Sequence, residues 1–140
     1  MFNDYQNGAE QRKSIIALLY QMASTDKNIS PIEKRYLNDI ASNIGLDGFS
    51  VDEVLANPKK YQLETPPDEG RRMTILYYLL FMMRVDGQIK EREEKLIHEA
   101  GFRLGFNELL TTDLIGVMKT YLNDDVPPEA MLEQIKKYMN

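Results

Sequence analysis

The chain has 140 residues, of which 43% are apolar and 28% are charged, and it contains no cysteine. This length and composition suit one globular domain with one core, and the missing cysteines exclude disulfides, thiolate metal sites and a cysteine nucleophile. The 22 acidic residues outnumber the 17 basic ones, and lysine and arginine are scattered along the sequence. Because nucleic-acid binding needs a positive surface that displaces counterions from phosphates, the composition argues against that function.

The N-terminal residues have neither the basic start nor the apolar run of a signal peptide, so we expect a cytoplasmic protein. The longest apolar run, residues 75–83, is far shorter than the roughly 20 residues that cross a bilayer. We therefore expect a core helix there and no transmembrane segment.

Two helices are predicted before residue 46. Apolar residues recur at helical spacing from about Ala9 to Ser24, with a buried face of Ile15, Ile16, Leu18, Leu19, Met22 and Ala23. The next helix starts at Ser30-Pro31-Ile32-Glu33, where the serine can accept a backbone N–H and the glutamate can bond back to the serine N–H. Its predicted buried residues are Tyr36, Leu37, Ile40, Ala41 and Ile44, and Gly45 is expected to end it.

The middle of the chain predicts a short helix, a connection and a long helix. Residues 50–53, Ser-Val-Asp-Glu, predict a second capping box, and Asn57-Pro58 should end the helix that it opens. Residues 58–68 contain three prolines and little periodicity, so we expect them to connect two halves. The helix from about Pro67 to Val85 is apolar on all sides in its later part, which is typical of a helix surrounded by others.

Three further helices are predicted after residue 88. The first repeats an earlier helix face sixty residues later with Leu96, Ile97, Ala100, Gly101 and Leu104, and its exposed side pairs Glu91 with Lys95 and Glu94 with His98. The second should bury Leu110, Leu114, Val117, Met118 and Tyr121. The third starts near Pro127-Pro128 and should bury Met131, Leu132, Ile135 and Tyr138. Met73, Met82, Met83, Met118 and Met131 fall on apolar faces, which favours core filling over an adaptable binding surface.

No stretch alternates with a period of two, so the predicted fold class is all-α, a bundle of about seven helices. We expect a single domain over residues 1–140, built from two repeated helix-turn-helix halves. The halves are placed at about 9–57 and 66–122, and a C-terminal helix follows at about 127–139.

The two halves share the pattern Asp-x-x-Ile-x-x-x-Glu, followed by an apolar helix face and a closing glycine. Its residues, sixty positions apart, are Asp26 and Asp86, Ile29 and Ile89, Glu33 and Glu93, and Gly45 and Gly105. Such self-similarity predicts an internal repeat of helix-turn-helix units.

The second copy also matches the latter half of an EF-hand loop, with Asp86 at the fifth position and Glu93 at the twelfth. The first and third positions of such a loop supply oxygen ligands, but here they are Met82 and Arg84. The first copy has a methionine and a serine there. A standard EF-hand is therefore excluded.

The doubled acidic turn, the glutamate in the following first turn and the closing glycine resemble the TerB-like domains of tellurite-resistance proteins. The matching residues are Asp26, Ile29, Glu33 and Gly45-Leu46, then Asp86-Gly87, Ile89, Glu93 and Gly105-Phe106. The resemblance covers nearly the whole chain, although Lys27 replaces the turn glycine in the first copy. It implies an all-helical bundle with a role in stress response or peripheral membrane-associated assemblies, and a divalent-metal site made by the acidic residues of both copies.

The four acidic residues have two readings. In one, Asp26, Glu33, Asp86 and Glu93 converge and bind Ca²⁺, Mg²⁺ or Mn²⁺ through carboxylate oxygens. In the other, the glutamates cap helices and the aspartates form turns. The sequence leaves both open, because it does not say whether the two turns face each other.

Enzyme chemistry has little support in the sequence. His98 is the only histidine, it is expected to pair with Glu94 at the surface, and neither a Gly-x-Ser-x-Gly turn nor a phosphate-binding glycine loop is present. We therefore expect a non-enzymatic, TerB-like interaction module with an unidentified protein partner, binding a divalent cation at its acidic turns. The alternatives are a structural or partner-binding bundle whose acids only cap helices, and a metal-dependent hydrolase with an open cleft beside them.

Overall fold

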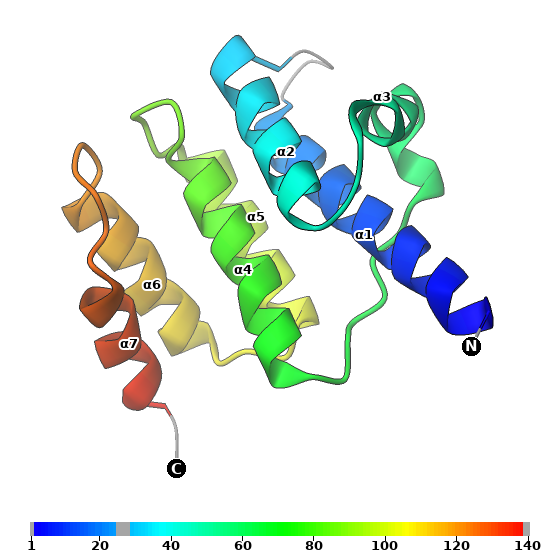
Figure 1. The fold of residues 1–140 in the computed structure, drawn as a ribbon. Helices are drawn as coiled ribbons and strands as arrows, with labels where there is room; N and C mark the ends of the chain where they lie inside the picture. Colours follow the sequence, from blue (N-terminus) through cyan, green and yellow to red (C-terminus); the bar gives the residue numbers. More distant parts are fainter. Residues whose placement is uncertain (1, 25–28, 139–140) are drawn as a thin grey trace. The chain divides into compact units, whose positions relative to one another are not determined.

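A computed structural model describes residues 2–24 and 29–138, and only the backbone of residues 2–7. Over these residues the chain forms seven α-helices and one short 3₁₀ helix and no strand, which confirms the all-α class (Figure 1). The chain divides into two compact units between Glu64 and Thr65, inside the connection predicted at residues 58–68. The prediction of a single domain stays open, and each unit is described by itself.

Unit 1, residues 1–64, contains α1 (Phe2–Ala23), α2 (Pro31–Asn43), α3 (Gly48–Ala56) and the 3₁₀ helix η1 (Pro58–Lys60). Helix α1 packs against the other three elements, and α2 also packs against α3. Helix α1 begins well before Ala9, the start that the sequence predicts. The core of the unit consists of residues that are almost fully buried, among them Ile16, Ala17, Leu19, Leu37, Ala41, Val51 and Val54.

Helix α2 begins as the sequence predicts. The Glu33 backbone N–H donates to Oγ of Ser30 at 3.2 Å, and the Ser30 N–H donates to Oε1 of Glu33 at 2.9 Å. This reciprocal pair satisfies two backbone N–H groups that a helix start would otherwise leave free. Leu37, Ile40 and Ala41 are buried as predicted, whereas Tyr36 and Ile44 are half-buried.

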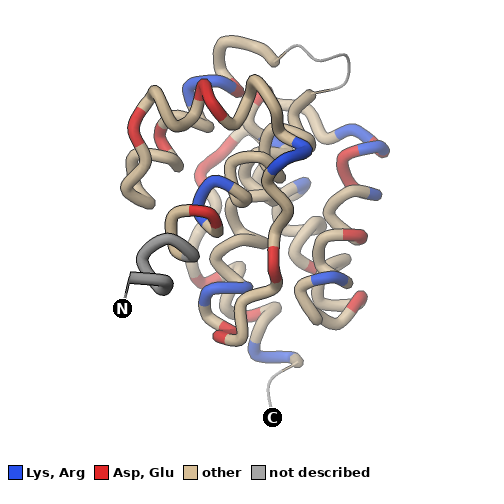
Figure 2. The backbone as a smooth tube through the Cα atoms, turned by 90° about the vertical axis from the view of Figure 1, so that its right-hand side faces the viewer, with Lys and Arg blue, Asp and Glu red and all other residues tan. Residues whose placement is uncertain are grey.

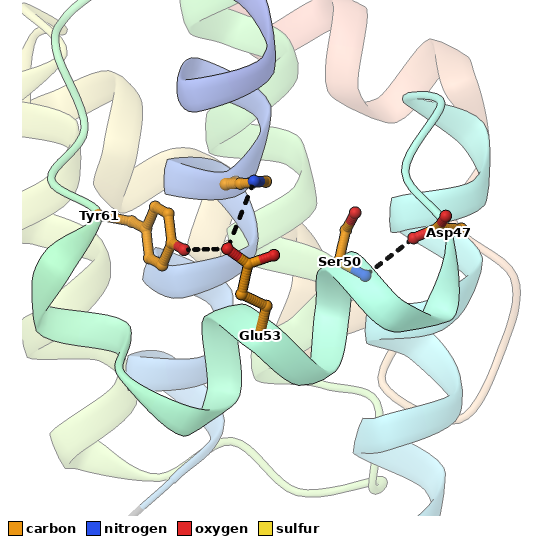
Figure 3. Close-up of polar contacts among 5 residues, drawn as sticks. Asp47, Ser50, Glu53 and Tyr61 are labelled. Atoms are coloured by element: carbon orange, nitrogen blue, oxygen red, sulfur yellow. Dashed lines mark hydrogen bonds and ion pairs between the residues drawn. The ribbon is translucent and has the colours of Figure 1, made fainter.

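The predicted start of the third helix is wrong by three residues. Asp47 caps α3, because its Oδ1 accepts the Ser50 backbone N–H at 2.8 Å, so Ser50 lies inside the helix (Figure 3). This hydrogen bond is the main reason that the pKa of Asp47 is lowered. The predicted end is confirmed, since α3 ends at Ala56, and Pro58 opens η1.

Unit 2, residues 65–140, contains α4 (Glu69–Met83), α5 (Glu91–Arg103), α6 (Glu108–Thr120) and α7 (Pro128–Lys136). Helix α5 packs against α4 and α6, and α6 also contacts α4 and α7. Helix α4 is shorter than predicted at both ends, because Asp68 caps it and Arg84 already leaves helical geometry. Its buried residues are Ile75, Leu76, Leu79, Leu80, Met82 and Met83.

The predicted core residues of unit 2 are mostly confirmed. On α5, Ile97, Ala100 and Gly101 are buried, as is Leu104 directly after it, whereas Leu96 is half-buried. On α6, Leu110, Leu114, Val117 and Met118 are buried, whereas Tyr121 directly after it is half-buried. On α7 the prediction fails for Leu132, which is 49% exposed, because the packing of α7 on α6 buries only Met131 of this helix. Of the methionines predicted to fill the core, Met82, Met83, Met118 and Met131 are buried.

The second helix of each unit ends in the same hydrogen bonds. Gly45 and Gly105 adopt φ values of 86° and 83°, where a side chain would be strained. The Leu46 N–H donates to the Ala41 carbonyl at 2.7 Å, and the Phe106 N–H donates to the Gly101 carbonyl at 2.9 Å. Both ends are therefore Schellman-type caps, at positions sixty residues apart.

An arginine approaches each of these caps from the first helix of the same unit. In unit 1, Nη1 of Arg12 donates to the Ile44 carbonyl at 3.2 Å. In unit 2, Nη1 of Arg72 lies 3.4 Å from the place where a Cβ of Gly105 would be. A cation at the C-terminal end of a helix interacts favourably with its dipole, so these arginines help to fix the ends of α2 and α5.

Candidate functional site

The structure describes three of the four predicted metal ligands, and these three are divided between the two units. Asp26 lies outside the described residues, while Glu33 belongs to unit 1, and Asp86 and Glu93 belong to unit 2. Among residues 8–24 and 29–138, whose side chains the structure describes, no three or more histidine, aspartate or glutamate side chains gather where they could hold a metal ion. The four-carboxylate site therefore stays a prediction.

Glu33 and Glu93 occupy the same structural position. Oε1 of Glu93 accepts the Lys90 backbone N–H at 2.9 Å, the same bond that Glu33 makes to Ser30. Lysine has no acceptor, so the second copy keeps only this half of the capping box. Glu93 is also only 4% exposed. A cation that used Oε1 of either glutamate would compete with a helix-capping hydrogen bond.

Asp86 forms a turn, as the second interpretation of the four acidic residues predicts. Oδ1 of Asp86 accepts the Gln88 backbone N–H at 3.2 Å, and Gly87 adopts a positive φ of 80°. An aspartate that bonds the N–H two residues on is a common turn former. The side chain is exposed, so it remains accessible to solvent ions.

The predicted surface pair between Glu94 and His98 is wrong. Oε1 of Glu94 instead lies 2.8 Å from Nζ of Lys119 on α6. His98 is half-buried, and its Nδ1 is buried without a hydrogen-bond partner among the residues that the structure describes. The packing of α6 against α5 places the Lys119 ammonium beside Glu94, so the carboxylate pairs with it instead of with the histidine four residues away.

A polar cluster that the sequence did not indicate lies in unit 1. The Tyr61 hydroxyl, following η1, donates to Oε1 of Glu53 on α3 at 3.1 Å, and Nζ of Lys13 on α1 lies 3.8 Å from the same oxygen (Figure 3). Tyr61 is 5% exposed, and its burial, helped by the bond to Glu53, raises its pKa. The cluster ties η1 to two helices. The helix end and Pro58 between Glu53 and Tyr61 leave no periodic signal for it.

Large apolar side chains are exposed at the start of the third helix of each unit. Phe49, the second residue of α3, is 77% exposed, and Leu109, the second residue of α6, is 63% exposed. Phe102, near the end of α5, is 82% exposed. Basic and acidic positions are interspersed along the described chain rather than collected in one stretch (Figure 2).

Comparisons with protein-family models, curated proteins and solved structures gave no match. The resemblance to TerB-like domains therefore rests on the residues of the two turns and the helix ends. Among the helices that the structure describes, none is both long and apolar enough to cross a membrane.

Proposed function

We propose that this chain is a non-enzymatic helical module of TerB-like type that acts by binding a protein partner, with its turn acids serving as helix caps and turn formers. The observation that carries the proposal is the exposure of Phe49 and Leu109 at the same position of two similarly built units. The matching glycine caps and glutamate bonds support the view that the units are copies of one helical hairpin.

The energetics favour a role in contact with another molecule. Burying a Leu or Phe side chain contributes about 1.5–3 kcal/mol, and Phe49 and Leu109 leave most of that stabilisation unused in their own units. Single exposed apolar residues are common on protein surfaces. Here the second residue of the third helix is an exposed, large apolar residue in both units. Phe102, which is also exposed, lies seven residues before Leu109. A few buried residues dominate the binding energy of many interfaces, and phenylalanine is among the residue types enriched there.

A photo-crosslinking residue placed at Leu109 in the living source cell should give a discrete crosslinked protein. The same residue placed at the exposed, charged Glu108 serves as the control and should give much less product. Phe102→Ser in the Leu109-labelled chain should reduce the product, while the melting temperature stays within about 2 °C because Phe102 is exposed. Equal products at both positions would contradict the proposal. A product with twice the mass of the chain would identify a second copy as the partner.

Adding millimolar Ca²⁺, Mg²⁺ or Mn²⁺ to the metal-free protein should leave its melting temperature at the value found in NaCl of equal ionic strength. The reason is that Glu33 and Glu93 already bond to backbone N–H groups. Glu93→Gln keeps an oxygen acceptor at this position and should change stability by less than about 1 kcal/mol. A cation-dependent increase that Asp26→Asn with Asp86→Asn abolishes would establish the metal site instead.

A further inference from the structure

The two compact units are joined by residues 61–68, between η1 and α4. Boundaries between structural units commonly fall in exposed, proline-containing segments of this kind, and relative motion of the units is then the ordinary expectation. The kind of motion depends on which backbone torsions of the connection are held by one unit or the other. The hydrogen bonds of this segment identify them.

The first half of the connection is attached to unit 1. Tyr61 is only 5% exposed. The Gln62 carbonyl accepts a hydrogen bond from the Ser14 hydroxyl at 3.1 Å. The Glu64 carbonyl accepts one from Nε2 of Gln11 at 2.7 Å. Both donors lie on α1, so the chain follows this helix as far as the carbonyl oxygen of residue 64.

The second half is attached to unit 2. Oγ1 of Thr65 donates to the Arg103 carbonyl, at the end of α5, at 3.2 Å. Residues 66 and 67 are both proline. A proline ring fixes its own φ near −65° and restricts the residue before it to extended ψ values, so residues 65–67 form a stiff, extended segment. Asp68 then caps α4 by accepting the Arg71 backbone N–H at 3.2 Å.

One backbone torsion lies between these two sets of attachments. The bond from Gln11 holds the peptide plane between Glu64 and Thr65, because the carbonyl oxygen of residue 64 is part of that plane. The side chain of Thr65 and everything after it move with unit 2. The torsion between them is φ of Thr65. In the extended region φ ranges from about −60° to −160°, which allows a rotation of about 100°.

We propose that Thr65 is a single-torsion hinge, and that unit 1 and unit 2 turn relative to each other about its N–Cα bond. Hinges between structural units are commonly a few residues that absorb a large change of backbone torsion. Rotation at this hinge changes the spacing between the exposed Phe49 of unit 1 and the exposed Leu109 of unit 2. The hinge does not depend on the function proposed above.

Electron–electron double resonance on the full chain, spin-labelled once in each unit, measures this motion. The chain has no cysteine of its own, so Asp39→Cys on α2 and Glu99→Cys on α5, both at exposed positions, carry the two labels. With an unaltered connection, the distance distribution between the labels should be broad. Thr65→Pro should narrow it about twofold or more, because the ring fixes φ of residue 65 and restricts ψ of Glu64.

Two control variants separate the torsion from the hydrogen bonds around it. Thr65→Val removes the bond to the Arg103 carbonyl and leaves φ of residue 65 unfixed, so its distribution should stay at least as broad as that of the unaltered connection. Gln11→Ala removes the bond that holds the Glu64 carbonyl and releases a second torsion, so it should broaden the distribution further.

The proline variant should fold, because no hydrogen bond of the Thr65 backbone N–H occurs in the described part of the chain. Its helical circular dichroism should match that of the unaltered chain. An unaltered connection that gives a distribution as narrow as Thr65→Pro would overturn the proposal. So would a folded Thr65→Pro variant with an undiminished width, or a Gln11→Ala variant with no increase in width.

Discussion

Gly101→Ala should destabilise the protein, although alanine is the better helix former. An ideal Cβ at Gly101 would lie 2.7 Å from Oγ1 of Thr111, where α5 and α6 pack together. Thr111 is β-branched and 1% exposed, so it can move aside only at a cost. Overpacking of this kind costs about 1–3 kcal/mol, against a gain of about 1 kcal/mol in helix propensity. Urea denaturation should show a net loss of up to about 2 kcal/mol.

The matched control for Gly101 lies on α6. A Cβ at Gly116 would meet no atom within 4 Å, and the residue is exposed. Gly116→Ala should therefore stabilise the protein by up to about 1 kcal/mol, opposite in sign to Gly101→Ala. Adding Thr111→Ala to Gly101→Ala should recover part of the loss, because it removes the atom that the new Cβ meets. A stabilising Gly101→Ala would show that α5 and α6 are more loosely packed.

Arg84→Met should cost about 2–3 kcal/mol. It removes the guanidinium whose Nη2 lies 2.7 Å, 3.1 Å and 2.7 Å from three carbonyls after α6, and bonds from a charged donor are worth about 1.5–3 kcal/mol. Methionine keeps the apolar stem in place, and the buried Nε of Arg84 has no hydrogen-bond partner to lose. The loss thus reports on the three carbonyl contacts together with the approach of the guanidinium to the Phe81 ring, whose centroid lies 5.9 Å away. Chemical denaturation gives its size.

A second variant separates charge from geometry at this position, and an arginine on α2 serves as the control. Arg84→Lys keeps the charge but has a shorter reach and no planar fork, so it should recover only part of the stability. Arg35→Met removes an exposed arginine on α2 and should change stability by less than about 0.5 kcal/mol. If Arg84→Met is as stable as the unaltered chain, water replaces the guanidinium at these carbonyls without loss.

Features that depend on adjacent residues could be predicted from the sequence. The bonds between Ser30 and Glu33 and the positive φ of Gly45 and Gly105 each follow from a few neighbouring residues. Local residues also explain why the predicted start of α3, at Ser50, is wrong. Asp47 and Ser50 are both good caps, so the local pattern does not choose between them, and in the structure Asp47 takes the role.

Contacts between helices could not be predicted in this way. Lys119 pairs with Glu94 because α6 lies against α5, whereas local spacing favoured His98. Arg84 contacts carbonyls about forty residues further along the chain, and no periodicity of the sequence indicates such a contact. For the candidate metal site, the structure gives the bonds of Glu33, Asp86 and Glu93, while convergence of the two turns remains a prediction.

The methionines in the core have a consequence for chemical damage. A thioether becomes a polar sulfoxide when peroxide reaches it, and a sulfoxide disrupts apolar packing. Met82, Met83 and Met118 are at most 1% exposed and are shielded while their helices stay folded. Met131 is shielded only by the contact of a short terminal helix. Under oxidative attack, Met131 should therefore be converted before the other three.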